Sequence, residues 1–234
     1  MVRAAKHRNF ECFSITEHIS QFKNPRKEIG FGSFHKSGRI FSDFDEYESE
    51  FANIGKKANK GLEVDFSPRY NRQVSDYVNE RKWDILLLSV HELSGGKDIE
   101  DKEGPQDRES SEKKWMDYFK LQEEALQNDL VSFVTLTHPV RLATSTRIVP
   151  SNFDESLLEL ATIAKEEDKA LELNGKDMAR DYSFVERLAK ACSEAHCRVS
   201  FGSDAHHPDE VGRGRENATD LIKRFSLSEA IFCQ

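Results

Sequence analysis

The chain contains no apolar run approaching the roughly 18 residues that a membrane span requires. Its first residues, MVRAAKHRNFECF, carry charge but lack the long apolar segment of a secretory signal. It has four cysteines, and none of them form a C-x-x-C pair. These absences predict a cytoplasmic protein with reduced, mostly buried thiols and no membrane partner.

An excess of positive charge is also absent. The chain has 34 Lys and Arg against 42 Asp and Glu, which gives a formal net charge of -8. Because an acidic chain repels nucleic acid at long range, we expect no nucleic-acid partner, although local basic groups can still hold one phosphate. The sequence shows neither internal repeats nor low-complexity tracts. Its 234 residues suit a single α/β domain spanning residues 1–234.

Short apolar runs alternate along the chain with longer amphipathic segments. The clearest run, residues 85–90 (ILLLSV), is typical of a strand buried on both faces of a parallel sheet. The other predicted strands are residues 13–16, 62–66, 133–137, 170–173 and 199–203. Apolar residues three and four apart predict helices around residues 44–54, 118–126, 157–164, 184–192 and 221–222. This alternation predicts βα units that form a parallel sheet or barrel.

Two helix starts and one long loop can be predicted from local signals. Asp43 is placed to cap the helix that follows it, and Ser151 with Asp154 has the spacing of a capping box. Residues 94–112 (SGGKDIEDKEGPQDRESSE) are polar and highly charged. A loop of this length is usually functional or disordered, so we expect either a lid at the rim of a site or a disordered segment.

Potential metal ligands follow almost every predicted strand. In chain order they are Glu17 and His18, Glu63 and Asp65, His91, His138, Glu172 and Asn174, and Asp204, His206 and His207. The carboxyl ends of the strands in a parallel βα barrel gather at one rim, where such folds place their chemistry. Imidazoles and carboxylates together suit zinc, manganese and iron. The sequence therefore predicts a metal site at this rim.

A single histidine after a strand is commonly a structural residue, but four strand ends that finish in histidine favour a shared site. The histidines elsewhere, His7, His35 and His196, are predicted to be surface residues. His207 adjoins His206, and the pattern alone leaves its role open.

The segments ITEH, GLEVDF, SVHEL, THPV, ELN and GSDAHHPDEVG occur in this order between residues 4 and 212. Together they resemble the PHP (polymerase and histidinol phosphatase) superfamily. The long polar insertion after SVHEL is similar to that of the monofunctional histidinol-phosphate phosphatases within it. The resemblance implies a distorted, TIM-like (β/α)7 barrel and a cluster of up to three divalent ions, which would be zinc, manganese or iron.

The same resemblance implies roles for individual residues. Glu63 would bridge two ions, and His91 and His138 would complete the ligands of one of them. The remaining ligands would be Asp204 on the other bridged ion and His18 and His206 on a third. His18, Glu63, Asp204 and His206 would form the catalytic centre, with Glu172 and Asn174 near it but not bound to metal.

One family feature is missing from this sequence. Members of the superfamily begin with a strand that ends in H-x-H, and the chain contains no H-x-H. Its first residues resemble the helix that should follow that strand. We therefore expect a barrel that lacks its first strand and binds fewer than three ions, through either a truncated gene model or a reworked site.

The resemblance implies a metal-dependent phosphomonoesterase that hydrolyses L-histidinol phosphate to L-histidinol and phosphate, a step of histidine biosynthesis. Metal-activated hydroxide would attack phosphorus, and a histidine or acid at the rim would protonate the leaving alkoxide. Arg141 and Arg180 are candidates for holding the phosphate, and each has the alternative of being a surface arginine. Two other functions stay open: action on another small phosphate ester or nucleotide, and an inactive, partly metallated module.

Overall fold

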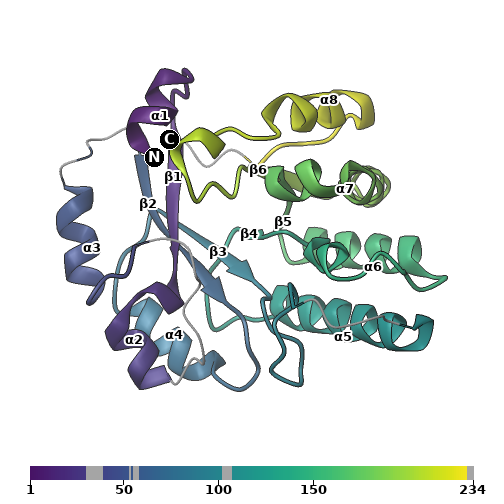
Figure 1. Cartoon of the computed structure of the whole chain (residues 1–234), viewed down its shortest axis with the longest axis horizontal. Helices are drawn as coiled ribbons and strands as arrows, with labels where there is room; N and C mark the ends of the chain where they lie inside the picture. Colours follow the sequence, from purple (N-terminus) through teal and green to yellow (C-terminus); the bar gives the residue numbers. More distant parts are fainter. Residues whose placement is uncertain (30–38, 53, 55–57, 102–106, 231–234) are drawn as a thin grey trace.

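A computed structural model describes residues 1–29, 39–52, 54, 58–101 and 107–230. These residues form six parallel strands, and the strand order in the sheet follows the order along the chain. The strands are β1 (Phe13–His18), β2 (Ala58–Asp65), β3 (Ile85–Ser89), β4 (Thr135–Leu136), β5 (Ala170–Asn174) and β6 (Arg198–Gly202). The sheet curls into a half-barrel (Figure 1). Among the described residues β1 and β6 do not pair with each other, so this side of the half-barrel is open.

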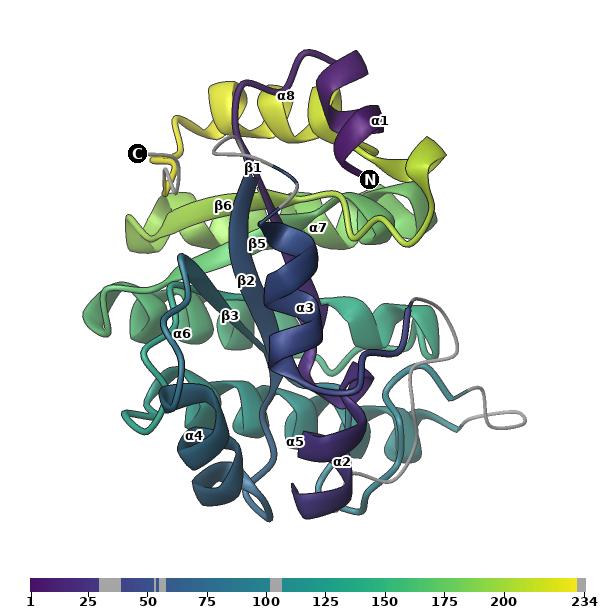
Figure 2. The same ribbon diagram turned by 90° about the vertical axis from the view of Figure 1, so that its left-hand side faces the viewer.

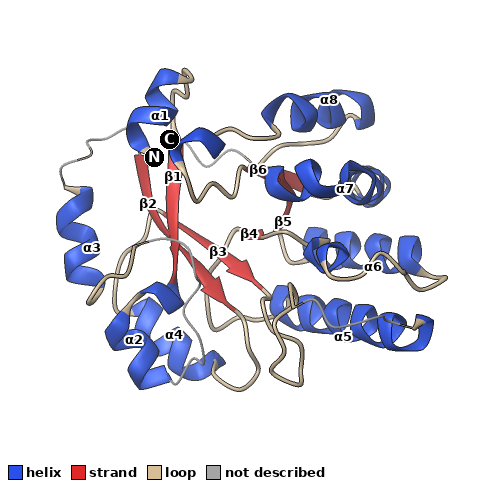
Figure 3. Ribbon diagram, viewed as in Figure 1, coloured by secondary structure: helices blue, strands red, loops and turns tan. Residues whose placement is uncertain are grey.

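Eight α-helices accompany the strands in the described ranges. They are α1 (Val2–His7), α2 (Lys23–Ile29), α3 (Phe44–Phe51), α4 (Asn71–Asn79), α5 (Arg108–Leu126), α6 (Phe153–Glu166), α7 (Gly175–Ala195) and α8 (Arg215–Phe225). Helices α5 to α8 stack side by side in chain order on one side of the sheet (Figures 1 and 3). Helix α3 lies against β1 and β2 (Figure 2), where the Tyr47 hydroxyl shares its hydrogen between the carbonyl oxygens of Ile15 and Gly61.

The strands are continuous apolar runs because their side chains are buried in the core. Leu62, Leu88 and Leu171 on neighbouring strands are fully or almost fully buried, because helices cover the sheet. On the helical side, the rings of Trp115 and Phe153 meet edge to face with centroids 4.8 Å apart, joining α5 to α6. Burial of these large side chains supplies most of the driving force that holds the helices on the sheet.

All six predicted strands are present, and the predicted cap of α3 is confirmed. The Asp43 carboxylate accepts a hydrogen bond of 3.0 Å from the Glu46 amide. The capping box predicted at Ser151 and Asp154 is wrong: the N-cap of α6 is Asn152, whose side chain makes no capping hydrogen bond. The next residue, Phe153, is completely buried, so packing sets the start of this helix.

The predicted loop over residues 94–112 is wrong at its C-terminal end. Helix α5 already begins at Arg108, because Asp107 caps it by accepting a hydrogen bond of 2.7 Å from the Ser110 amide. Earlier in this segment the Ile99 side chain is buried, and the Ile99 amide donates to the His91 carbonyl. Residues 94–101 are therefore anchored beside the strand ends, and residues 102–106 lie outside the described part.

The structure bears on the predictions about the cysteines and about membrane-spanning segments. Cys192 and Cys197 are buried and free, as predicted, whereas Cys12 is disulfide-bonded, so the prediction of reduced thiols is wrong for that residue. In the part of the chain that the structure describes, none of the helices has both the length and the apolar character needed to cross a membrane.

Candidate metal centre

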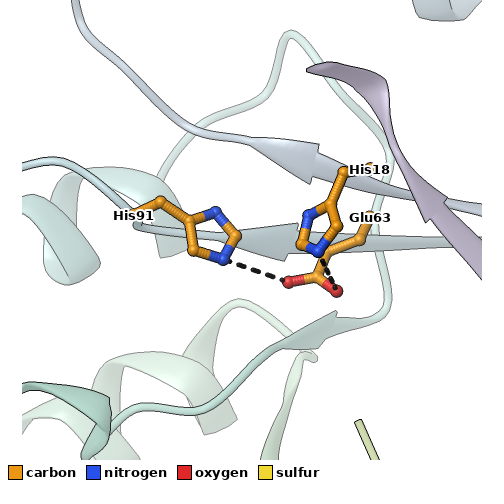
Figure 4. A group of neighbouring side chains, drawn as sticks. All are labelled: His18, Glu63 and His91. Atoms are coloured by element: carbon orange, nitrogen blue, oxygen red, sulfur yellow. Dashed lines mark ion pairs between the residues drawn. The ribbon is translucent and has the colours of Figure 1, made fainter. Parts of the chain in front are cut away.

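Parallel pairing brings the ends of β1, β2 and β3 together at one edge of the sheet. In this register His18 lies beside Glu63, and His91 follows β3 by two residues. Figure 4 shows the three side chains converging, and one potential ligand atom from each lies within 4.8 Å of the others. This is a group of two imidazoles and one carboxylate, a donor set that suits zinc and similar divalent ions.

His138, which follows β4, completes a tighter group. Its Nε2 atom lies 3.2 Å from Glu63 Oε1 and 3.1 Å from His91 Nε2, and His91 Nε2 lies 3.6 Å from the same Glu63 oxygen. Ligand atoms bound at about 2.0–2.2 Å to a tetrahedral ion are about 3.4 Å apart. The triangle of Glu63, His91 and His138 therefore fits three ligands of one ion.

Glu63 offers its second oxygen to a different histidine. Glu63 Oε2 lies 3.9 Å from His18 Nε2, while Oε1 faces His91 and His138. Although burial opposes charge, the three neighbouring histidines hold the pKa of Glu63 well below its usual value of 4.5. An ionised carboxylate with its two oxygens facing separate imidazole groups is suited to bridging two ions.

Asp65 fixes the ring of His91. Its Oδ1 atom lies 2.5 Å from His91 Nδ1, with Ser89 Oγ 3.1 Å from the same nitrogen. A carboxylate at Nδ1 keeps the proton there and leaves Nε2 as the metal-binding atom. Burial lowers the pKa of His91, but Asp65 and Glu63 outweigh it and raise that pKa overall. Glu63 and Asp65 are two residues apart in β2, so their side chains point to the same face of the strand. This spacing is the sequence signal that could have identified Asp65 as the partner of a metal-binding histidine.

Two hydrogen bonds to its backbone hold His138 in an uncommon conformation. Its φ is +37°, an uncommon conformation for a residue with a side chain. Its amide donates to Glu172 Oε2 at 2.9 Å, and its carbonyl accepts from the Tyr118 hydroxyl at 3.0 Å. Asn174 also donates to Glu172 Oε2, at 2.8 Å. Burial and the nearby Arg141 lower the pKa of His138 to about 4, so the ring is neutral and able to bind metal.

Asp204 and His206 lie at the edge of this group. The structure places Asp204 Oδ2 2.5 Å from Arg141 Nη2 and 3.7 Å from Lys176 Nζ. The other carboxylate oxygen lies 3.2 Å from His206 Nδ1. The His206 ring is 6.3 Å from that of His18, measured between centroids. Both predicted ligands therefore line the same cavity as Glu63 but are engaged with other side chains.

Arg141 is buried rather than exposed, which excludes the surface alternative for this residue. Its guanidinium donates to Asp177, to Asn174 at 3.1 Å, to Asp204 and to Glu100 at 3.1 Å. Arg180, the second candidate, is exposed, with 41% of its side chain accessible, and donates to Glu100 at 2.8 Å. Both arginines thus meet at one glutamate beside the candidate metal centre.

The other histidines lie away from the candidate metal centre or outside the described residues. His7 and His196 are exposed, as predicted, and His35 lies outside the described residues. His207 is exposed and caps a short 3-10 helix (Pro208–Glu210), which answers the question that the sequence left open. Sequence reasoning missed Glu100 and Lys176. Glu100 lies in the polar insertion, and Lys176 follows the ELN segment (residues 172–174) without being part of it.

Comparison with known proteins places this geometry in a family. A histidinol phosphate phosphatase from Lactococcus lactis subsp. lactis Il1403, solved with zinc, L-histidinol and phosphate, superposes with a TM-score of 0.72 and 21% identity, covering 97% of this chain and 87% of that one. An archaeal ribonuclease P structure with mature tRNA gives a TM-score of 0.47 at 17% identity, covering 91% and 81%, which is too weak to bear on function.

A search of curated proteins by sequence found no match. The model of the PHP domain, in contrast, matches residues 1–176 of the 234, and these residues include Glu63, His91 and His138. The chain belongs to the PHP domain family.

Proposed function

We propose that the protein is a metal-dependent phosphomonoesterase and that its substrate is L-histidinol phosphate. The observation that carries this proposal is the arrangement around Glu63, whose two oxygens face separate histidines at metal-ligand spacing. Family membership supports the phosphoesterase class. The Lactococcus lactis enzyme, which has the same fold and was solved with L-histidinol and phosphate, supports the choice of substrate.

Bound divalent ions would supply Lewis acidity and activate water for attack on phosphorus. Glu63, His91 and His138 would hold one ion, and His18, which faces the other Glu63 oxygen, would help to hold a second. Zinc, manganese and iron are all compatible with these ligands. The chain's own contribution is to keep the ligands correctly protonated: Glu63 ionised, His138 neutral, and the His91 proton on Nδ1.

Cationic side chains beside the metal centre would bind the phosphate oxygens. Arg141 is positioned by Asp177 and Asn174, so its guanidinium is already oriented when a substrate arrives. His206 is partly exposed at the rim and would donate a proton to the leaving alkoxide. Asp204, which accepts from Arg141, would join the metal ligands once an ion competes for it.

The test combines metal analysis with a substrate panel. Purified protein is reconstituted with zinc, manganese or iron, its bound metal is counted, and phosphate release is measured from histidinol phosphate, sugar phosphates and nucleotides. We expect bound metal, activity lost on chelation, and the highest kcat/KM for histidinol phosphate. Glu63→Gln should lower metal content and activity by at least 100-fold, whereas Glu80→Gln, an exposed matched control on the same strand–helix unit, should change neither.

A second function is favoured by the position of Asp204. Arg141 and Lys176 engage its carboxylate, so Asp204 is already paired with cations rather than placed as a ligand of a second ion. A protein that binds one ion or none and releases no phosphate from any ester would be an inactive, at most partly metallated module. A preference for another ester over histidinol phosphate would instead disprove only the specific substrate.

A further inference from the structure

Three cationic side chains meet at one oxygen of Glu100. Glu100 Oε1 lies 2.8 Å from Arg180 Nη1, 3.1 Å from Arg141 Nη1 and 3.9 Å from Lys176 Nζ. These groups come from three separate parts of the chain: the segment after β3, the segment after β4, and α7. Burial opposes the charge on Glu100, but Arg141, Lys176 and Arg180 lower its pKa to about 2, so the carboxylate is ionised.

The cations around Glu100 adjoin the candidate metal centre. Lys176 Nζ lies between Glu100 and Asp204, at 3.9 and 3.7 Å from their carboxylate oxygens. Glu100, Arg141 and Lys176 line the same small cavity as Glu63 and the histidines. An anion at this position therefore sits within reach of both the cations and the metal ligands, as the phosphate of an ester must during hydrolysis.

Glu100 lines two cavities of different size beside these cations. The cavity beside the metal ligands is about 40 Å³. A water molecule needs roughly 10–15 Å³ by this measure, so the cavity holds about three waters and has no room for a phosphate with an organic group attached. Glu100 also lines the adjacent cavity, of about 430 Å³, whose walls include Val140 and Phe184. The Glu100 side chain thus separates a small charged cavity from a larger, partly apolar one.

Glu100 can leave this position without unfolding the segment around it. The backbone leading to Glu100 is held, because the buried Ile99 donates its amide to the His91 carbonyl and the Glu100 amide donates to Asp98 Oδ1 at 2.7 Å. The Glu100 side chain itself is 36% exposed. Rotation of this side chain into solvent would remove one carboxylate from Arg141, Lys176 and Arg180 and open the small cavity toward the larger one, while Asp177, Asn174 and Asp204 would keep Arg141 in place.

We propose that Glu100 is an internal anion that occupies the phosphate-binding position formed by Arg141, Lys176 and Arg180, and that a phosphate ester binds by displacing it. The phosphate would take the small cavity and the organic group the larger one. This inference rests on the proposed function, because it names the phosphate subsite of the same centre. It adds Lys176 as a phosphate-binding residue and Glu100 as a residue that weakens binding.

The test measures binding of inorganic phosphate by titration calorimetry, in chelator-treated and in zinc-loaded protein. Glu100→Gln should lower the Kd for phosphate by at least 10-fold, because the amide has similar size without the competing charge. Lys176→Met should raise the Kd by at least 10-fold. Asp101→Asn is the matched control, since it removes one negative charge from the next, exposed residue, and its Kd should stay within twofold of wild type.

Equal phosphate affinity in wild type and Glu100→Gln would overturn the inference, as would an equal gain in Asp101→Asn, which would indicate a general charge effect. Glu100→Ala, with folding checked by circular dichroism, repeats the test if the glutamine variant is unstable. Because binding is read directly, a Glu100→Gln gain in protein that hydrolyses no ester would leave this inference standing while the proposed function fails.

Discussion

Individual residues in this protein depend on partners that lie far away in the sequence. The position of His138 at the rim was predictable because His138 follows an apolar run, and that of Glu63 because Glu63 lies within another predicted strand. The burial of Arg141 was not predictable, because its partner Glu100 lies 41 residues away in a polar segment that carries no motif. A strand-end pattern reveals which residues reach the rim, but not which charges pair once they are there.

At this scale Asp65 should control metal affinity without binding metal. Asp65→Asn removes the charge that keeps the His91 proton on Nδ1, so we expect metal affinity to fall 10- to 100-fold. Competition with a chromogenic chelator measures this change. Asp76→Asn, on the exposed face of α4, is the control and should bind metal as wild type does. Unchanged affinity in Asp65→Asn would show that His91 is positioned by its packing alone.

Glu172 should make stability depend on pH. Its burial raises its pKa to about 8 from an ordinary value of 4.5. Between these values the folded protein holds a proton that the unfolded chain has lost, so stability is full below about pH 4.5 and decreases as the pH rises through 8.

We expect the free energy of unfolding of chelator-treated protein to fall by more than about 1 kcal/mol from pH 5 to pH 8. Glu172→Gln, which keeps the acceptor for the His138 amide, should remove that decrease. Urea unfolding at both pH values provides the measurement, with the exposed Glu216→Gln as control. The same decrease in Glu172→Gln as in wild type would show that other groups titrate.

At the scale of elements, the sequence predicted all six strands but not every helix. The strands are short apolar runs bounded by polar residues, and such runs have few alternatives in an α/β chain. Helix α4 was missed because its buried side chains, Val74 and Val78, form too small a stripe among polar residues. Helix α2 was missed because it is short and mostly polar; its Pro25 lies in the first turn, where proline is tolerated.

The junction between α7 and α8 should tolerate no side chain at Gly175. A Cβ added there would lie 2.0 Å from the Arg213 carbonyl oxygen, so two backbones would have to separate. Gly175→Ala should therefore destabilise the fold by at least about 2 kcal/mol. Gly95→Ala, where nothing lies within 4 Å of the added atom, should change stability by less than about 1 kcal/mol. Chemical denaturation of both variants makes the comparison, and equal midpoints would contradict the close approach.

For the whole molecule, the sequence led to an expectation of a barrel without its first strand, and the described residues form a half-barrel whose open side lies between β1 and β6. A cleft of about 560 Å³ opens there, lined by residues of both strands. The missing H-x-H motif predicted an incomplete barrel, but the strand pairing around the gap is not visible in the sequence, because strands pair through backbone atoms that every residue shares. The candidate ligands His18, Glu63, Asp204 and His206 also line this cleft, so the candidate metal centre borders the opening.

Because its ligands come from four separate segments, metal should stabilise the entire fold. Zinc present at 100 times its Kd should raise the free energy of unfolding by about 2.7 kcal/mol. Thermal melts with zinc and with a chelator measure the shift. In Glu63→Gln the shift should be largely lost, while Glu80→Gln should keep it. A full shift in Glu63→Gln would mean that zinc acts elsewhere on the molecule.

The match between strand order and chain order has a consequence for synthesis. Every parallel pair joins two strands that are consecutive along the chain, so β-pairing needs contacts of only moderate sequence separation. Such a chain can add one strand after another as it leaves the ribosome. The triangle of Glu63, His91 and His138 comes from the first four strands of the sheet. A metal ion bound there, as proposed, would therefore hold these four strands together before β5 and β6 have paired.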